Sequence, residues 1–162
     1  DLDNMARLFR MADFPGVCAN YDVSATVLKD LVKPYVVFER DGVKIGVLGL
    51  GCQLEGMVQA NKCVGVVYND PVTVANEVAA VLKEKEGCDV VVCLSHLGVQ
   101  YDENQLIPKT RNIDVVLGGH SHTFMKGPKT LLNMDGKNVS LMHTGKSGIY
   151  VGQMDLTLEK KK

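Results

Sequence analysis

Two of the four histidines in this 162-residue chain lie two positions apart, directly behind a pair of glycines. The segment reads Gly118-Gly119-His120-Ser121-His122 and follows an apolar run at 113–117. Residues i and i+2 of an extended backbone point the same way, so both imidazoles could face one point in space. The glycines remove side-chain bulk where the backbone must turn and approach a ligand. The segment therefore predicts a metal-binding loop at the end of a buried strand.

A third histidine follows a second apolar run. The run at 90–94 leads into Ser95 and His96. In open α/β sheets, ligands bind where loops leave the carboxyl ends of the strands. Taken alone, His96 could equally be a capping or hydrogen-bonded loop residue. Behind two neighbouring parallel strands, the arrangement favours metal ligation by His96, His120 and His122 on one rim.

The rest of the chain alternates helical and strand patterns, which predicts a parallel sheet covered on both faces. The Asp41-Gly42 pair between two β-rich runs predicts a hairpin. Asp70 and Pro71 predict a helix start, as N-cap and first helical residue. We expect helices at 2–12, 70–87 and 102–110, and strands at 16–19, 35–38, 43–50, 89–94, 113–117, 139–143 and 149–158.

Length and composition are those of one globular domain, with 46% hydrophobic and 23% charged residues. A net charge of -1 gives no strong pull toward nucleic acid or an anionic membrane. No apolar run approaches the ~20 residues that a membrane span needs. Five cysteines without a CxxC pair argue against a disulfide framework. We therefore expect neither a nucleic-acid partner nor a membrane span.

The two histidine motifs, in this order, resemble those of the calcineurin-like metallophosphoesterases, and more narrowly those of the 5′-nucleotidase family of secreted and periplasmic nucleotide phosphatases. Segments 14–20, 43–50, 69–71 and 145–155 resemble that family in the same order. The resemblance implies an α/β fold that is part of the family's α/β/β/α sandwich, with mixed sheets and flanking helices. It also implies a hydrolase of phosphoric ester bonds, with a nucleotide or another phosphomonoester as substrate. A periplasmic or extracellular location is implied too, although the chain contains no signal segment.

Two motifs of the family are missing. Its members hold two divalent metal ions with ligands from an early Asp-x-His, a bridging Asp and a Gly-Asn-His motif, besides the later histidines. This chain contains neither Asp-x-His nor Gly-Asn-His. We therefore expect residues 1–162 to form a single domain that is the C-terminal portion of a metallophosphoesterase catalytic domain.

The resemblance assigns His96 and His120 to one metal ion and His122 to the other, and it places Asn20 near the substrate phosphate. Zn, Mn or Fe would suit such a site. In the intact family site, two ions activate a hydroxide for attack on phosphorus. We interpret His143, on the predicted strand 139–143, as a structural residue.

By itself, the chain keeps two ligands for one ion and one for the other, whereas zinc sites normally use three or four. We therefore expect weak or absent metal binding and no phosphatase activity from it alone. Half a sheet would also leave an open edge and an uncovered apolar face. We expect the chain to compensate by dimerisation into a homo-oligomer, by strand pairing or by a rearranged core.

Two other hypotheses compete with the enzyme. The missing ligands favour a non-catalytic binding or assembly module with a degenerate metal site. A nucleotide-binding domain with Gly49-Leu50-Gly51 as its phosphate loop is disfavoured, because G-x-G-x-x-G is absent and no helix clearly follows.

Overall fold

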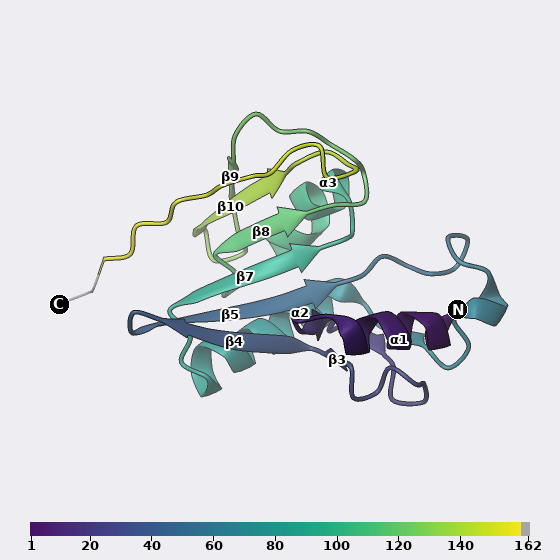
Figure 1. Ribbon diagram of the computed structural model, residues 1–162. Helices are drawn as coiled ribbons and strands as arrows, with labels where there is room; N and C mark the ends of the chain where they lie inside the picture. The colour runs from purple at the N-terminus through teal and green to yellow at the C-terminus, as the bar shows by residue number, and fades with distance from the viewer. Residues whose placement is uncertain (160–162) are drawn as a thin grey trace.

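A six-stranded mixed sheet forms the centre of the protein, with its strands in the order β4-β5-β7-β8-β10-β9 (Figure 1). The computed structural model describes residues 1–159. The inner strands run parallel, and an antiparallel strand lies at each edge. The strands are β4 (Tyr35–Arg40), β5 (Val43–Leu50), β7 (Val90–Ser95), β8 (Val115–Gly118), β9 (Lys129–Leu132) and β10 (Asn138–His143). This is the expected α/β fold with a mixed sheet and flanking helices.

The helices of two strand connections lie behind this sheet in Figure 1, on the face away from the viewer. The β5–β7 connection contains α2 (Pro71–Ala80) and the π-helical turn η2 (Val81–Lys85). The β7–β8 connection contains α3 (Val99–Tyr101), η3 (Asp102–Leu106) and η4 (Ile107–Lys109). Because β5, β7 and β8 follow one another in a single direction across the sheet, right-handed crossovers place both connections on the same face.

The main core fills the space between the sheet and these helices. Its largest fully buried side chains include Leu48, Leu82, Val91, Leu106, Val116 and Leu141. Local signals place the elements around it as predicted. The Asp70 side chain accepts a hydrogen bond from the Thr73 N–H and caps α2, with Pro71 as its first residue. Asp41 and Gly42 both have positive φ in the β4–β5 turn, which suits a tight hairpin.

A smaller unit precedes and borders the sheet. It contains α1 (Leu2–Met11), η1 (Ala60–Lys62), the parallel pair β1 (Gly16–Val17) and β3 (Val32–Lys33), and the antiparallel pair β2 (Tyr21–Asp22) and β6 (Val67–Tyr68). Ala6, Val23 and Leu28 form its own small core. None of the helices within residues 1–159 combines the length and apolar character that crossing a membrane would take.

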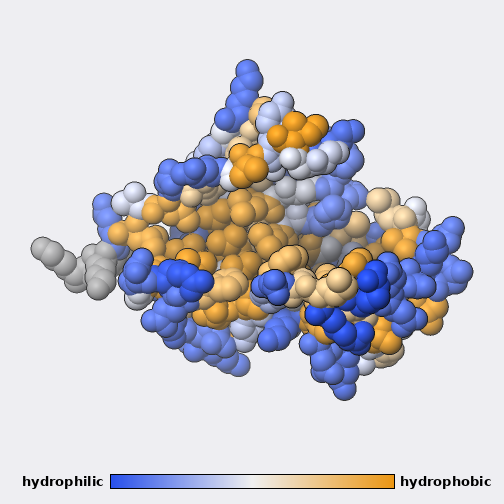
Figure 2. Space-filling model, in the orientation of Figure 1, coloured by the Kyte–Doolittle hydropathy of each residue, from blue (hydrophilic) through white to orange (hydrophobic). Residues whose placement is uncertain are grey.

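The front face of the sheet is apolar and partly exposed. Leu94 on β7 pairs with Leu117 on β8, and the two residues are 40% and 39% exposed. Figure 2 shows apolar side chains gathered over the middle of this face. The prediction of a sheet covered on both faces is therefore wrong over β7 and β8, whereas the expected uncovered apolar face is present.

The strands of the structure differ from the predicted strands in two places. Residues 149–158 form no strand, and Val151 is 96% exposed. Alternating β-rich residues become a strand only where a partner strand is in reach. Conversely, β9 pairs antiparallel with β10 at the sheet edge, although its sequence gave no strand signal strong enough to predict it.

Candidate metal centre

Three potential metal ligands converge at the carboxyl-end rim of the sheet. Leu50, Ser95 and Gly118 are the last residues of β5, β7 and β8 and lie side by side in register. The loops that leave these strands carry Cys52, His96 and His120. One ligand atom from each of the three lies within 4.8 Å of the others. The rings of His96 and His120 meet edge to face with centroids 5.0 Å apart.

His122 is not part of this cluster among residues 1–159. The expectation that His120 and His122 point the same way requires an extended backbone, and that premise is wrong. His120 has φ 70° and His122 has φ 55°, so both lie in the left-handed region. The chain therefore turns between them, and His122 is exposed beside the cluster.

The surroundings of the His96 ring favour its neutral form. Desolvation lowers its pKa, and the nearby His120 and His122 lower it further. A neutral imidazole has one nitrogen lone pair free to act as a ligand. The Gly119 N–H donates to the Ser95 carbonyl at 2.8 Å, so a backbone hydrogen bond connects the two histidine loops where they leave the sheet. A Cβ at position 119 would lie 3.2 Å from His96 Nδ1, so glycine lets the loop pass close to the ring.

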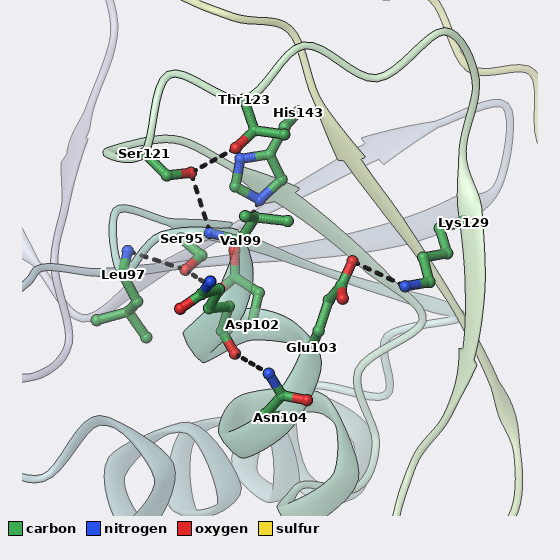
Figure 3. A network of polar contacts seen from close by, with 11 residues as sticks. Ser95, Leu97, Val99, Asp102, Glu103, Asn104, Ser121, Thr123, Lys129 and His143 are labelled. Carbon is green, nitrogen blue, oxygen red and sulfur yellow. Dashed lines mark hydrogen bonds and ion pairs between the residues drawn. The ribbon is translucent and has the colours of Figure 1, made fainter.

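A buried polar network lies behind the rim (Figure 3). His143, 1% exposed, places Nε2 2.9 Å from Asp102 Oδ2. The Ser95 hydroxyl donates to Asp102 Oδ1 at 2.5 Å. Burial raises the pKa of the Asp102 carboxyl. Because Ser95 contacts the aspartate and not the histidine, the trio is not a serine-nucleophile triad, in which the histidine bonds the serine. It ties the end of β7, beside His96, to β10.

Ser121 fixes the second histidine loop. Its Oγ accepts a hydrogen bond from the Val99 N–H at 3.1 Å and lies 3.0 Å from Thr123 Oγ1. Figure 3 shows Ser121 and Thr123 pointing toward each other above the start of α3. The loop that carries His120 is thus held against the helical segment that follows His96.

Asn20 fastens the loop after β5. It is fully buried, its Oδ1 accepts from the Gly51 N–H at 2.8 Å, and its Nδ2 donates to the Gly51 carbonyl at 2.9 Å. The Tyr21 hydroxyl donates to the Cys52 carbonyl. The structure thus places Asn20 behind the rim with its amide engaged by backbone, and its proximity to a substrate phosphate stays a prediction.

Asn20→Ala should lower the free energy of unfolding by about 2 kcal/mol, because it leaves the partly buried backbone N–H and carbonyl of Gly51 without their side-chain partner. Urea denaturation followed by circular dichroism would measure the loss. Asn104→Ala is the matched control, since Asn104 is exposed and makes one hydrogen bond to the Gln100 carbonyl. Equal stability of the two variants would contradict the role given to Asn20.

Cys52 was not predicted from the sequence as a ligand. A signal was nevertheless present, because Cys52 follows the last residue of β5 at the same spacing at which His120 follows the last residue of β8. Finding it requires knowing that β5 neighbours β7, which only the sheet order provides.

The fold is that of calcineurin-like phosphoesterases. The structure superposes on the calcineurin-like phosphoesterase YfkN of Bacillus subtilis with a TM-score of 0.59 and 29% identity, covering 72% of this chain and 40% of that one. It superposes on a 5′-nucleotidase precursor of Thermus thermophilus with a TM-score of 0.79 and 30% identity, covering 86% and 29%. The sequence is 32% identical over 132 residues to a 5′-nucleotidase of Vibrio cholerae, covering 72% of this chain and 24% of the relative. No family model matches the chain.

More narrowly, the resemblance to the 5′-nucleotidase family of these phosphoesterases is confirmed over most of the chain. The chain spans about a quarter of the Vibrio cholerae relative and less than a third of the Thermus thermophilus protein.

Proposed function

We propose that this chain is part of a metal-dependent phosphomonoesterase, specifically a 5′-nucleotidase that hydrolyses nucleoside monophosphates. The observation that carries the proposal is the meeting of His96 and His120 from adjacent strand ends, 5.0 Å apart between ring centroids, in a fold shared with 5′-nucleotidases. In this proposal residues 1–162 contribute the C-terminal portion of a catalytic domain in the periplasm or outside the cell.

His96 and His120 would hold one metal ion, and His122 would bind a second. The separate position of His122 supports its assignment to another ion. When bound, a pair of Zn, Mn or Fe ions supplies a hydroxide nucleophile and neutralises charge on the phosphoryl group. The chain's own residues keep the ligands in place: Ser121 anchors the His120 loop, and Ser95 fixes the strand end beside His96.

The rest of the site would come from outside this chain. The Asp-x-His and Gly-Asn-His motifs are absent from its sequence, so the proposed dinuclear site is incomplete here. The exposed apolar face over Leu94 and Leu117 suits coverage by the remainder of such a domain. By itself the chain should therefore be inactive, and its self-association through this face stays a prediction.

Metal binding tests the ligand assignment. In calorimetric titrations of the purified chain with Zn²⁺, His96→Ala and His120→Ala should each weaken binding by roughly tenfold or more, since each removes a ligand. Lys126→Ala, an exposed change in the same loop region, should leave it unaltered. If uptake is indifferent to both histidines, the assignment is wrong.

A phosphatase assay separates the enzyme from its alternative. The mass-verified chain should not turn over AMP with any of the three metals, and turnover would contradict its incompleteness. In a longer protein that contains this sequence and both missing motifs, AMP hydrolysis should fall together with metal content in the histidine variants. A fully metal-loaded long form without hydrolysis would instead favour the binding or assembly module, which the missing motifs support.

A further inference from the structure

We propose that Cys52 is a third ligand of the metal ion held by His96 and His120, so that this chain alone forms a zinc site of one thiolate and two imidazoles. The inference rests on the proposed function for the role of the two histidines. It adds a ligand from a third strand end and commits the site to one kind of metal.

The distances fit a tetrahedral ion after small side-chain movements. The Cys52 Sγ and one nitrogen from each ring lie within 4.8 Å of one another. With Zn–S of about 2.3 Å and Zn–N of about 2.0–2.1 Å, tetrahedral ligands would stand about 3.4–3.6 Å apart. A closure of about 1 Å is therefore needed. Cys52 is only half-buried and His96 is exposed, so both side chains can rotate to supply it.

The backbone that carries Cys52 is fixed, which makes its approach to the histidines a built feature. The Asn20 amide holds both backbone polar groups of Gly51, and the Tyr21 hydroxyl holds the Cys52 carbonyl. A Cβ at position 51 would lie 2.3 Å from the Tyr21 ring, so the loop packs tightly on the tyrosine. The Cys52 thiol is reduced and is not consumed by a disulfide.

The donor set selects the metal. Thiolate is a soft ligand that suits zinc and disfavours magnesium and manganese, and imidazole also suits zinc. Three protein ligands leave a fourth position open, which is the composition of catalytic zinc sites. With two imidazoles as its only ligands, a zinc ion would be bound weakly. With the thiolate as a third ligand, we expect measurable zinc affinity and release of the thiol proton when the metal binds.

Cobalt substitution tests the thiolate directly, without any activity assay. Titration of the purified chain with Co²⁺ should produce a thiolate-to-cobalt charge-transfer band in the near ultraviolet, and Zn²⁺ should displace it far more effectively than Mn²⁺. Cys52→Ala should abolish the band and weaken Zn²⁺ binding by roughly tenfold or more. Cys63→Ala is the matched control, because Cys63 is another half-buried free cysteine but lies at the end of η1. Circular dichroism checks that each variant is folded.

The outcomes separate this inference from the proposed function. Visible Co²⁺ absorption that needs His96 and His120, without a thiolate band, would overturn the role of Cys52 and leave the histidine assignment standing. A band that survives Cys52→Ala would also overturn it. Co²⁺ uptake that needs neither histidine would end both proposals. Loss of the band in Cys52→Ala, His96→Ala and His120→Ala, with its retention in Cys63→Ala, is the result we expect.

Discussion

Gly118→Ala should destabilise the protein by about 3 kcal/mol or more, although it adds one methyl group. A Cβ at this position would lie 1.9 Å from Nε2 of His143. The His143 ring cannot shift away, because it is 1% exposed and its Nε2 lies 2.9 Å from Asp102 Oδ2. Accommodating the methyl group therefore means breaking a buried polar pair or moving β8 away from β10.

Urea denaturation of the purified variants would measure this effect. Gly127→Ala is the matched control, since a Cβ at position 127 meets no atom within 4 Å and its backbone is not left-handed. It should change stability by less than about 0.5 kcal/mol. Comparable losses in both glycine variants would show that the contact between residue 118 and the His143 ring is not the cause.

His143→Ala should cost about 3–5 kcal/mol, because it leaves the fully buried Asp102 carboxyl with only the Ser95 hydroxyl as a side-chain partner. Thermal and urea unfolding would measure the loss. His122→Ala is the control, since His122 is exposed. A loss no larger than that of the control would mean that the buried pair contributes nothing to the fold.

The loss in His143→Ala should also depend on pH. Burial raises the pKa of Asp102, so the folded variant holds the carboxyl proton to higher pH than the unfolded chain does. The folded state then binds more protons than the unfolded state, and stability falls as pH rises through that interval. The variant should therefore be more stable at mildly acidic pH than at neutral pH.

The double variant links these two expectations. Without the imidazole ring, the methyl group of Gly118→Ala has space that the ring filled in the native protein. Gly118→Ala should therefore cost much less in the His143→Ala background than in the native one. Simple additivity of the two losses would indicate that Gly118 is constrained by something other than the ring.

Local sequence signals were sufficient for most of the sheet and for helix α2. Asp70 and Pro71 mark a helix start, and Asp41-Gly42 marks a hairpin, through contacts that span only a few residues. The errors occur where strand formation depends on whether a partner strand is present. The segment 149–158 has strand-like composition but no partner, and β9 exists because β10 lies beside it.

The same division applies to the candidate metal centre. The proximity of His96 to His120 could be predicted, because each residue follows an apolar strand and the ends of parallel strands meet at one rim. The direction of His122 could not, because two left-handed φ values turn the backbone between the histidines. Cys52 could not, because its place beside them depends on strand order across the sheet.

The antiparallel edge strands β4 and β9 limit how the sheet can be extended by further strands. Charged Glu39 and Arg40 lie on one margin and Lys129 on the other, and such residues discourage side-by-side addition of further strands. Lateral, fibril-like extension is therefore opposed, whereas the exposed Leu94 and Leu117 leave an apolar face that another polypeptide layer would cover. A layer packed on this face would border the rim that carries the histidines. The same polypeptide would then bury the apolar surface and bring further metal ligands to the rim.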